Sequence, residues 1–177
     1  MSKCKFDKVY VWDLELTNWP KETGKPREII EIGIAVILLG EDFGVAQVDN
    51  ILVRPEHGID EATSELTGLS WNSLKGAMPL VGACNKLMRL HGALKRSHGT
   101  WGEDDVVLRK ICAEKDIKYP FSNKHINIQT LFTLREGLTE NASLEKAFDV
   151  YKLKMYGNQH TAAHDAYNTA RIFRYML

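Results

Sequence analysis

The sequence predicts a single α/β domain, in which a mixed sheet forms early in the chain and helices follow it. Strand-like apolar runs joined by short polar segments occupy the chain up to Pro55. After residue 60 the apolar residues recur at helical spacing instead. A chain of 177 residues with 44% hydrophobic content has enough apolar surface for one core. We therefore expect residues 1–177 to form one domain.

Three early runs predict an antiparallel meander. The run Lys8–Thr17 is rich in β-branched and aliphatic residues and is too short for a typical helix, so we expect a buried strand. Pro20 ends it, and Arg27–Leu39 forms a second strand. After a turn at residues 40–44, the run Ala46–Val53 forms the third. The short connections between these strands favour antiparallel pairing.

The rest of the chain predicts helices with a further short strand. Apolar residues at helical spacing predict an amphipathic helix over residues 80–94 that packs on the sheet. A second helix follows Gly102. The run His125–Gln129 favours a short strand, and Ser143 is a good N-cap for a later helix. We expect the last helix to begin near His164.

Composition excludes several classes of protein. The 23 basic residues balance the 23 acidic ones, so any binding of nucleic acid has to be local, for example through bound metal ions. Three widely spaced cysteines, Cys4, Cys84 and Cys112, favour reduced thiols over a disulfide framework or a zinc site. Membrane-length apolar runs and a signal-peptide pattern are absent from the sequence. These features predict a soluble, cytoplasmic protein that does not bind membranes.

Two acidic residues in the first strand suggest a cation site. Asp13 and Glu15 are two residues apart, so their side chains point to the same face of the strand. Like charges this close are costly in an apolar strand unless a cation neutralises them, and Mg²⁺ and Mn²⁺ prefer such oxygen ligands. The alternative is a solvated strand end at which both acids face water.

The segment HTAAHDAYNTARIF near the end of the chain adds a histidine and another acid. His160 precedes a predicted helix, and Asp165 lies in its first turn, where the helix dipole favours a carboxylate. A histidine on the preceding loop can act as a general base near neutral pH. His164 competes for this role, although a lone histidine is more often structural.

Taken together, these blocks resemble the DEDDh subgroup of the DnaQ-like 3′→5′ exonucleases, which have an RNase H-like fold. Members of this subgroup carry a DxE in the first strand, an acid in a middle helix and a final H-x4-D. The matching residues in this sequence are Asp13, Glu15, Asp105, His160 and Asp165. Further likeness lies in EIIEIGIAVI, LTGLS and HDAYNTARI. The TWGxxD block at Thr100–Asp105 resembles the branch of Eri1-like RNA exonucleases.

One departure from the family pattern affects the middle acid. Asp104 precedes Asp105 where relatives commonly have an aromatic residue, so a shift of one residue would exchange their roles. The spacing from Gly102 favours Asp105.

The resemblance implies a two-metal mechanism. Asp13, Glu15, Asp105 and Asp165 would hold two divalent cations, Mg²⁺ or Mn²⁺, about 4 Å apart around the scissile phosphate. His160 would take a proton from the attacking water. The products would be nucleoside 5′-monophosphates, released from the 3′ ends of single-stranded RNA or DNA, with RNA slightly favoured.

Substrate contacts are expected directly after the first acids. The resemblance places Leu16 and Thr17 beside the terminal nucleotide, where their backbone would contact the 3′ sugar. Trp19 is the best candidate for an aromatic that faces substrate, whereas Trp101 favours packing. Basic residues around the predicted helix at 80–94 favour a solvated face over phosphate contacts; they are Lys86, Arg89, Lys95 and Arg96.

Other functions stay open from the sequence. One is a catalytically silent relative that binds nucleic acid, although the intact acids and histidine argue against it. Another is an exonuclease subunit of the DNA proofreading type. A third is an unrelated α/β protein with scattered surface acids. The sequence also leaves open a protein partner or a homodimer.

Overall fold

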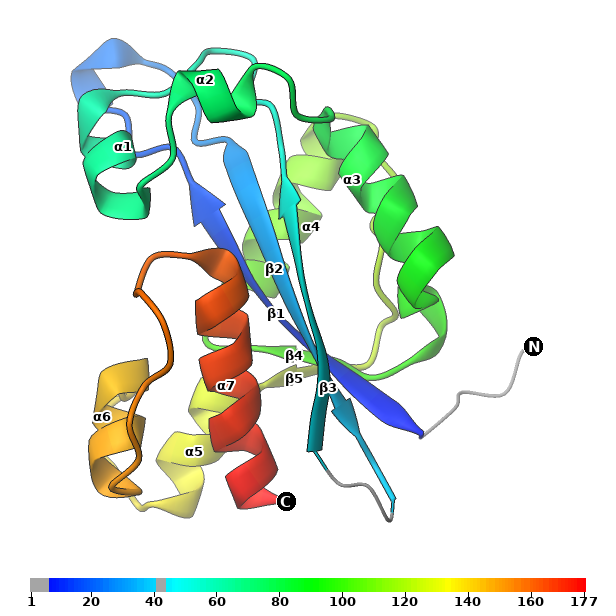
Figure 1. Ribbon diagram of the computed structural model, residues 1–177, viewed down its shortest axis with the longest axis vertical. Helices are drawn as coiled ribbons and strands as arrows, with labels where there is room; N and C mark the ends of the chain where they lie inside the picture. Colours follow the sequence, from blue (N-terminus) through cyan, green and yellow to red (C-terminus); the bar gives the residue numbers. More distant parts are fainter. Residues whose placement is uncertain (1–6, 41–43) are drawn as a thin grey trace.

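The computed structural model describes residues 7–40 and 44–177, and within them a five-stranded sheet lies between two groups of helices (Figure 1). The strand order is β3-β2-β1-β4-β5. The strands are β1 (Lys8–Leu16), β2 (Ile29–Leu38), β3 (Gly44–Leu52), β4 (His98–Thr100) and β5 (His125–Asn127). The first three pair antiparallel, whereas β4 pairs parallel with β1 and β5 parallel with β4. The predicted α/β class, with a meander extended by parallel strands, is confirmed.

The helices divide between the two faces of the sheet. Their bounds are α1 (Glu61–Thr67), α2 (Trp71–Leu74), α3 (Leu80–Lys86), α4 (Asp104–Glu114), α5 (Ile128–Arg135), α6 (Leu144–Val150) and α7 (Ala162–Met176). One face packs against α3 and α4, and the opposite face against α5, α6 and α7. The short helices α1 and α2 lie beyond one end of the strands (Figure 1). None of the helices in these described ranges is both long and apolar enough to cross a membrane.

Several predicted elements have different bounds in the structure. The helix predicted over 80–94 is regular only to Lys86; it continues as a π-helical turn and ends at Gly92, whose φ is 59°. The strand predicted over His125–Gln129 stops at Asn127, because the Asn127 side chain accepts a hydrogen bond from the Thr130 amide and caps α5. Ser143 caps α6 as predicted. Helix α7 begins at Ala162, slightly before the predicted start.

Two predictions involve residues outside the described ranges: the free thiol of Cys4 and part of the turn at residues 40–44. Cys4 lies outside them, and so do positions 41–43 of the predicted turn. Of the other cysteines, Cys84 and Cys112 are free and buried in the core on the α3 and α4 face. Their sulfur atoms are 4.0 Å apart.

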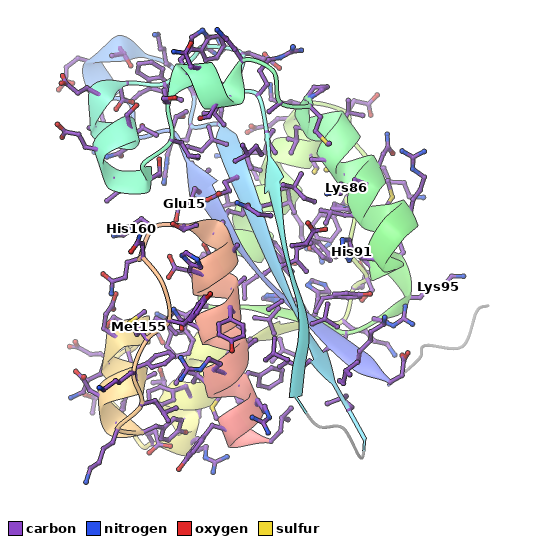
Figure 2. The ribbon with its side chains drawn as sticks, in the orientation of Figure 1. Glu15, Lys86, His91, Lys95, Met155 and His160 are labelled. Carbon is purple, nitrogen blue, oxygen red and sulfur yellow. The ribbon has the colours of Figure 1, made fainter. Side chains whose placement is uncertain are left out.

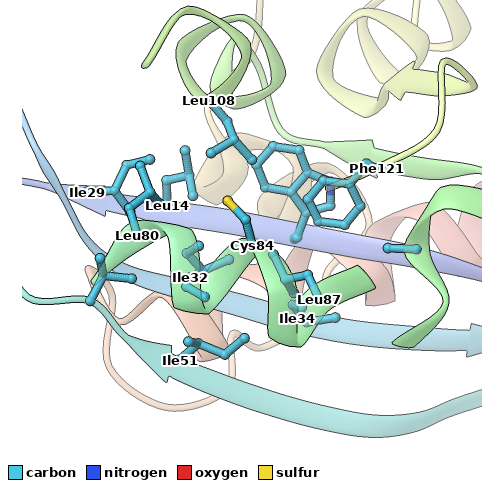
Figure 3. Close-up of a cluster of buried hydrophobic side chains, with 14 of the residues drawn as sticks. Leu14, Ile29, Ile32, Ile34, Ile51, Leu80, Cys84, Leu87, Leu108 and Phe121 are labelled. Carbon is cyan, nitrogen blue, oxygen red and sulfur yellow. The ribbon is translucent and has the colours of Figure 1, made fainter. Parts of the chain in front are cut away.

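Alternation along β1 sends its side chains into two different cores. Tyr10, Trp12 and Leu14 join the cluster under α3 and α4, and Figure 3 shows Leu14 there beside Cys84 and Leu108. Val9 and Val11 join the cluster under α7. Asp13 and Glu15 continue this second row, because residues two apart share a face of a strand. The strand therefore presents its acids at the edge of the apolar contact with α7.

The first turn of α7 lies directly on β2. Gly33 pairs with Asp13 across the β1–β2 ladder, and a Cβ atom on Gly33 would lie only 1.9 Å from the carbonyl oxygen of Ala162. Glu31, which is 2% exposed, accepts a hydrogen bond of 2.8 Å from the Ala162 amide. Its other oxygen accepts one of 2.6 Å from the Asn50 side chain. These contacts place the start of α7, and Asp165 with it, against the sheet next to Asp13.

Substitution of Gly33 by alanine should therefore be strongly destabilising. The added methyl group would overlap the backbone of Ala162, so we expect the free energy of unfolding to fall by about 3 kcal/mol or more. Gly76→Ala is the matched control, because a Cβ atom there meets nothing within 4 Å, and it should change stability by less than about 0.5 kcal/mol. Urea denaturation of both variants measures the difference. Equal effects would contradict this account of how α7 sits on the sheet.

Candidate active site

Three predicted acids converge at the N-terminal end of α7. Asp13 and Glu15 project from β1, and Asp165 lies in the first turn of α7. One carboxylate oxygen from each of the three lies within 4.8 Å of the others. The positive end of the α7 dipole favours the Asp165 carboxylate at this position. Residues far apart in the sequence thus form one acidic cluster.

His160 lies at the rim of the same cluster. Its backbone amide donates a hydrogen bond of 2.8 Å to Oδ2 of Asp165, and its φ of 59° bends the chain into the left-handed region. The side chain is exposed and lines a hollow of about 230 Å³ together with Asp13 and Asp165. Figure 2 shows Glu15 and His160 at this end of α7. His160 is therefore placed beside the acids and open to solvent.

The pKa values of these acids reflect burial and mutual repulsion. Burial raises the pKa of Glu15 to about 8, and the neighbouring carboxylates, Asp165 foremost, add to the shift. Burial likewise raises the pKa of Asp13, with further contributions from the surrounding acids. Burial also raises the pKa of Asp165. Ionising these buried and mutually repelling carboxylates costs free energy, and a bound cation would lower that cost.

Asp105, the middle acid favoured by sequence spacing, does not lie in this cluster. Its carboxylate accepts a hydrogen bond of 2.6 Å from Nε of Arg109 and another from the hydroxyl of Tyr119. Burial opposes ionisation of Asp105, but these two hydrogen bonds lower its pKa below the ordinary value. The side chain is thus engaged with α4 and with the segment that follows it.

Asp104, rather than Asp105, interacts electrostatically with the two acids of β1. Its carboxylate accepts a hydrogen bond from the backbone of Leu14, the residue between the two acids of β1. Its charge raises the pKa values of both Asp13 and Glu15, and burial raises its own pKa to about 7. Asp104 also lies one helical turn before Leu108, which packs in the core under α4. The spacing from Leu108 does not distinguish the two aspartates, because Asp105 lies three residues before Leu108 and is buried on the same side of the helix.

A second group of side chains has the composition of a metal site, but its polar atoms form hydrogen bonds within the protein. His98, Asp105 and His125 each have one possible ligand atom within 4.8 Å of the others. However, the ring nitrogens of His98 are hydrogen-bonded, one to the Ser122 carbonyl at 2.9 Å and one to the indole of Trp12 at 3.1 Å. Burial lowers the pKa of His98 to about 4, so its ring is neutral at pH 7. The group forms a hydrogen-bond network beneath α4.

The residues predicted to contact substrate have different environments. Leu16 is half-buried at the end of β1. Thr17 is fully buried, and its hydroxyl accepts a hydrogen bond of 2.9 Å from the Glu28 amide, so its side chain points into the protein. Trp19 is half-buried with Lys25 3.7 Å from its ring centroid, and its indole N–H has no partner within the described part of the chain. The nitrogen atom of this N–H is itself buried, whereas part of the Trp19 ring is exposed.

Trp101 combines packing with a place at the hollow. Its indole N–H donates to the carbonyl of Ala142, and its ring packs 5.7 Å from that of Phe132, as a packing residue would. It also lines the hollow beside Asp13. Sequence reasoning did not identify the other wall of the hollow, which comes from separate elements: Gln129, Ser143, Leu144, Glu145 and Gln159.

Two of the basic residues around α3 have acidic partners. Lys86 lies 3.6 Å from Asp49, and Arg96 forms two hydrogen bonds of 3.1 Å with Asp7. Their charges are therefore engaged within the protein.

The acidic cluster fits a hard divalent cation. Oxygen ligands are those that Mg²⁺ and Mn²⁺ prefer, and this donor set consists of carboxylates. Burial, followed by repulsion from the neighbouring carboxylates, raises the pKa values of Asp13 and Glu15, and a bound cation would favour their ionised forms. Asp13, Glu15 and Asp165 are the residues suited to hold such an ion, and Asp104 is near enough to raise the pKa values of Asp13 and Glu15.

Without a cation, the protein should lose stability as pH rises. Glu15 has a pKa of about 8 when folded against an ordinary value of 4.5, and Asp104 about 7 against 3.8. Between the two values the folded state binds more protons than the unfolded state, so the free energy of unfolding falls from about pH 5 to pH 8. Urea denaturation in EDTA measures this slope. Glu15→Gln should reduce it, and an unchanged slope in that variant would contradict the assignment.

Comparisons with solved structures show that the fold is shared with known proteins. The nuclease domain of 3′hExo, described as a DEDDh family member bound to rAMP, superposes with a TM-score of 0.86 at 23% identity, covering 99% of this chain and 94% of that one. A full-length 3′-exonuclease gives a TM-score of 0.84 at 23% identity, over 99% of this chain but only 62% of that one. Pop2p of S. pombe, in its Mg²⁺- and Mn²⁺-bound form, gives 0.70 at 18% identity, covering 95% and 82%.

These superpositions establish the shared fold, and the family follows from the sequence match. No curated protein matches the chain. The family model described as Exonuclease matches residues 10–173, which include most of β1, all of α4 and most of α7. The chain belongs to the RNase_T exonuclease family.

Proposed function

We propose that this protein is a metal-dependent 3′→5′ exonuclease that hydrolyses phosphodiester bonds of single-stranded nucleic acid and releases nucleoside 5′-monophosphates. The observation that carries the proposal is the convergence of Asp13, Glu15 and Asp165, with His160 at the rim of the same hollow. Membership of the exonuclease family supports hydrolysis of nucleic acid. The direction is supported by the relatives described as 3′-exonucleases.

The proposed ligands of two divalent cations are Asp13, Glu15, Asp104 and Asp165. Pop2p, a structural relative, is described with Mg²⁺ and Mn²⁺ bound, which supports either ion. When bound, such cations neutralise the phosphate and make water acidic enough to deprotonate near neutral pH. A neutral chain would then hold a polyanion through these ions, so we expect substrate affinity to depend on metal.

His160 is the proposed general base. Its ring is exposed at the rim of the hollow, where it is free to take a proton from the attacking water. Its backbone amide meanwhile orients the Asp165 carboxylate. His164 is less suited to this role, because its Nδ1 accepts a hydrogen bond of 3.1 Å from the Asn158 amide.

RNA is the proposed preferred substrate. The TWGxxD block resembles that of RNA exonucleases, and the relative with a TM-score of 0.86 is described with rAMP bound. A silent binding relative would be expected to have lost acids at the site, whereas here the acids and His160 are retained. Leu16, the backbone of Thr17 and Trp19 are the proposed contacts for the terminal nucleotide, since Leu16 ends β1 directly after Glu15 and the other two follow it in the chain.

Degradation of labelled single strands tests the proposal. RNA and DNA of equal sequence, labelled at the 5′ end, should shorten stepwise from the 3′ end in Mg²⁺ or Mn²⁺. EDTA and Asp13→Ala should abolish the ladder, because each removes a part of the cation site. We expect the RNA to be degraded faster than the DNA. Internal cuts, shortening from the 5′ end or no cleavage with metal bound would contradict the proposal.

The adjacent acids of α4 should behave differently on mutation. Asp104→Asn should lower kcat by more than about 100-fold, because it would remove a ligand of the cation. Loss of a residue that only hydrogen-bonds to a ligand costs about 10- to 100-fold. Asp105→Asn should lower it by roughly 10-fold or less while destabilising the protein, because it weakens the contacts with Arg109 and Tyr119. Single-turnover assays and urea denaturation of both variants measure the contrast. A greater loss of activity in Asp105→Asn would restore Asp105 as the ligand.

A further inference from the structure

We propose that three side chains on one face of α7, namely His164, Asn168 and Arg171, form a clamp that holds the loop 154–160 and thereby positions His160. The inference rests on the proposed function, in which His160 is the general base. The loop has no helix or strand between α6 and α7, and Figure 2 shows Met155 and His160 along it beside α7.

Asn168 makes the central contact of the clamp. It is 1% exposed, and its Oδ1 accepts a hydrogen bond of 2.9 Å from the Tyr156 amide. Its Nδ2 donates one of 2.9 Å to the Tyr156 carbonyl. Asparagine offers a donor and an acceptor from one group, so a single side chain satisfies both backbone groups of Tyr156. Alanine would leave both of them unpaired.

His164 and Arg171 hold the loop on either side of this contact. Nδ1 of His164 accepts a hydrogen bond from the Asn158 amide, and the chain crosses the imidazole so closely that a Cβ atom on Gly157 would lie 2.6 Å from it. Nη1 of Arg171 donates a hydrogen bond of 2.7 Å to the Lys154 carbonyl. Backbone groups at residues 154, 156 and 158 are thus fixed by side chains of one helix.

The spacing of the clamp links the loop to the acidic cluster. Residues 164, 168 and 171 lie at i, i+4 and i+7, so they share one stripe along α7. The same helix carries Asp165, whose carboxylate accepts from the His160 amide. Helix α7 therefore sets both the acid and the loop that presents the base. A base that is already held in place before substrate binds loses less conformational entropy on reaching the transition state. Misplacement of such a group by about 1 Å can lower the rate about 100-fold.

His160 and Asn168 should therefore be coupled in catalysis. We expect Asn168→Ala to lower kcat on single-stranded RNA by roughly 10- to 100-fold. The Mn²⁺ concentration that gives half of the maximal increase in melting temperature should shift by less than about threefold. Thr169→Ala is the matched control: this neighbour on α7 is equally buried, and its hydroxyl has no hydrogen-bond partner among the described residues. In a His160→Ala background, Asn168→Ala should lower kcat less than about twofold.

Two results in these assays would overturn the proposal. One is a loss in Asn168→Ala no larger than in Thr169→Ala. The other is a full loss in the His160→Ala background, which would mean that Asn168 acts independently of the base. If Asn168→Ala does not fold, Gly157→Ala displaces the loop from His164 without altering α7 and should give the same loss of kcat.

Hydrogen exchange tests the clamp without any activity. The amides of Tyr156 and Asn158 should exchange faster in Asn168→Ala than in the unmodified protein, and Thr169→Ala should leave them unchanged. Unchanged protection in Asn168→Ala would overturn the clamp itself. A protein that cleaves nothing but shows the expected exchange would contradict the proposed function while confirming the clamp.

Discussion

The close packing of α7 on Gly33 of β2 is the contact on which the site depends. Because Gly33 has no side chain, the backbone of Ala162 approaches the sheet opposite Asp13. The buried carboxylate of Glu31 then fixes the first amide of the helix. Asp165 reaches the acids of β1 only through this approach, and the clamp along α7 extends the same alignment to the loop of His160. One contact between strand and helix therefore sets the geometry of acids and base together.

The site and the network beneath α4 handle negative charge in opposite ways. At the site, carboxylates gather with too few positive partners, and their pKa values are raised. Under α4, Asp105 is paired with Arg109 and Tyr119, and its pKa is lowered. Two adjacent residues of one helix thus have opposite electrostatic environments. The unbalanced group is suited to bind cations, whereas the balanced group stabilises the start of α4 and, with it, the orientation of Asp104.

The sequence predicted the elements whose signal is local. Alternation along β1 was enough to place Asp13 and Glu15 on one face, and a helix start near His164 was enough to place Asp165 in a first turn. It did not resolve Asp104 from Asp105, because a shift of one residue in a helix depends on which apolar side chains face the sheet. The buried side chain of Thr17 and the far wall of the hollow likewise depend on tertiary contacts. Such contacts bring together residues whose spacing in the sequence carries no signal.

The most direct test of the account is to locate bound Mn²⁺ by anomalous scattering from crystals of the protein. Peaks are expected among Asp13, Glu15, Asp104 and Asp165. None is expected between His98, Asp105 and His125, because both ring nitrogens of His98, Nε2 of His125 and the Asp105 carboxylate are hydrogen-bonded within the protein. A peak at the histidine group, or none at the acids in millimolar Mn²⁺, would contradict the central claim that the acids gathered by α7 form the cation site.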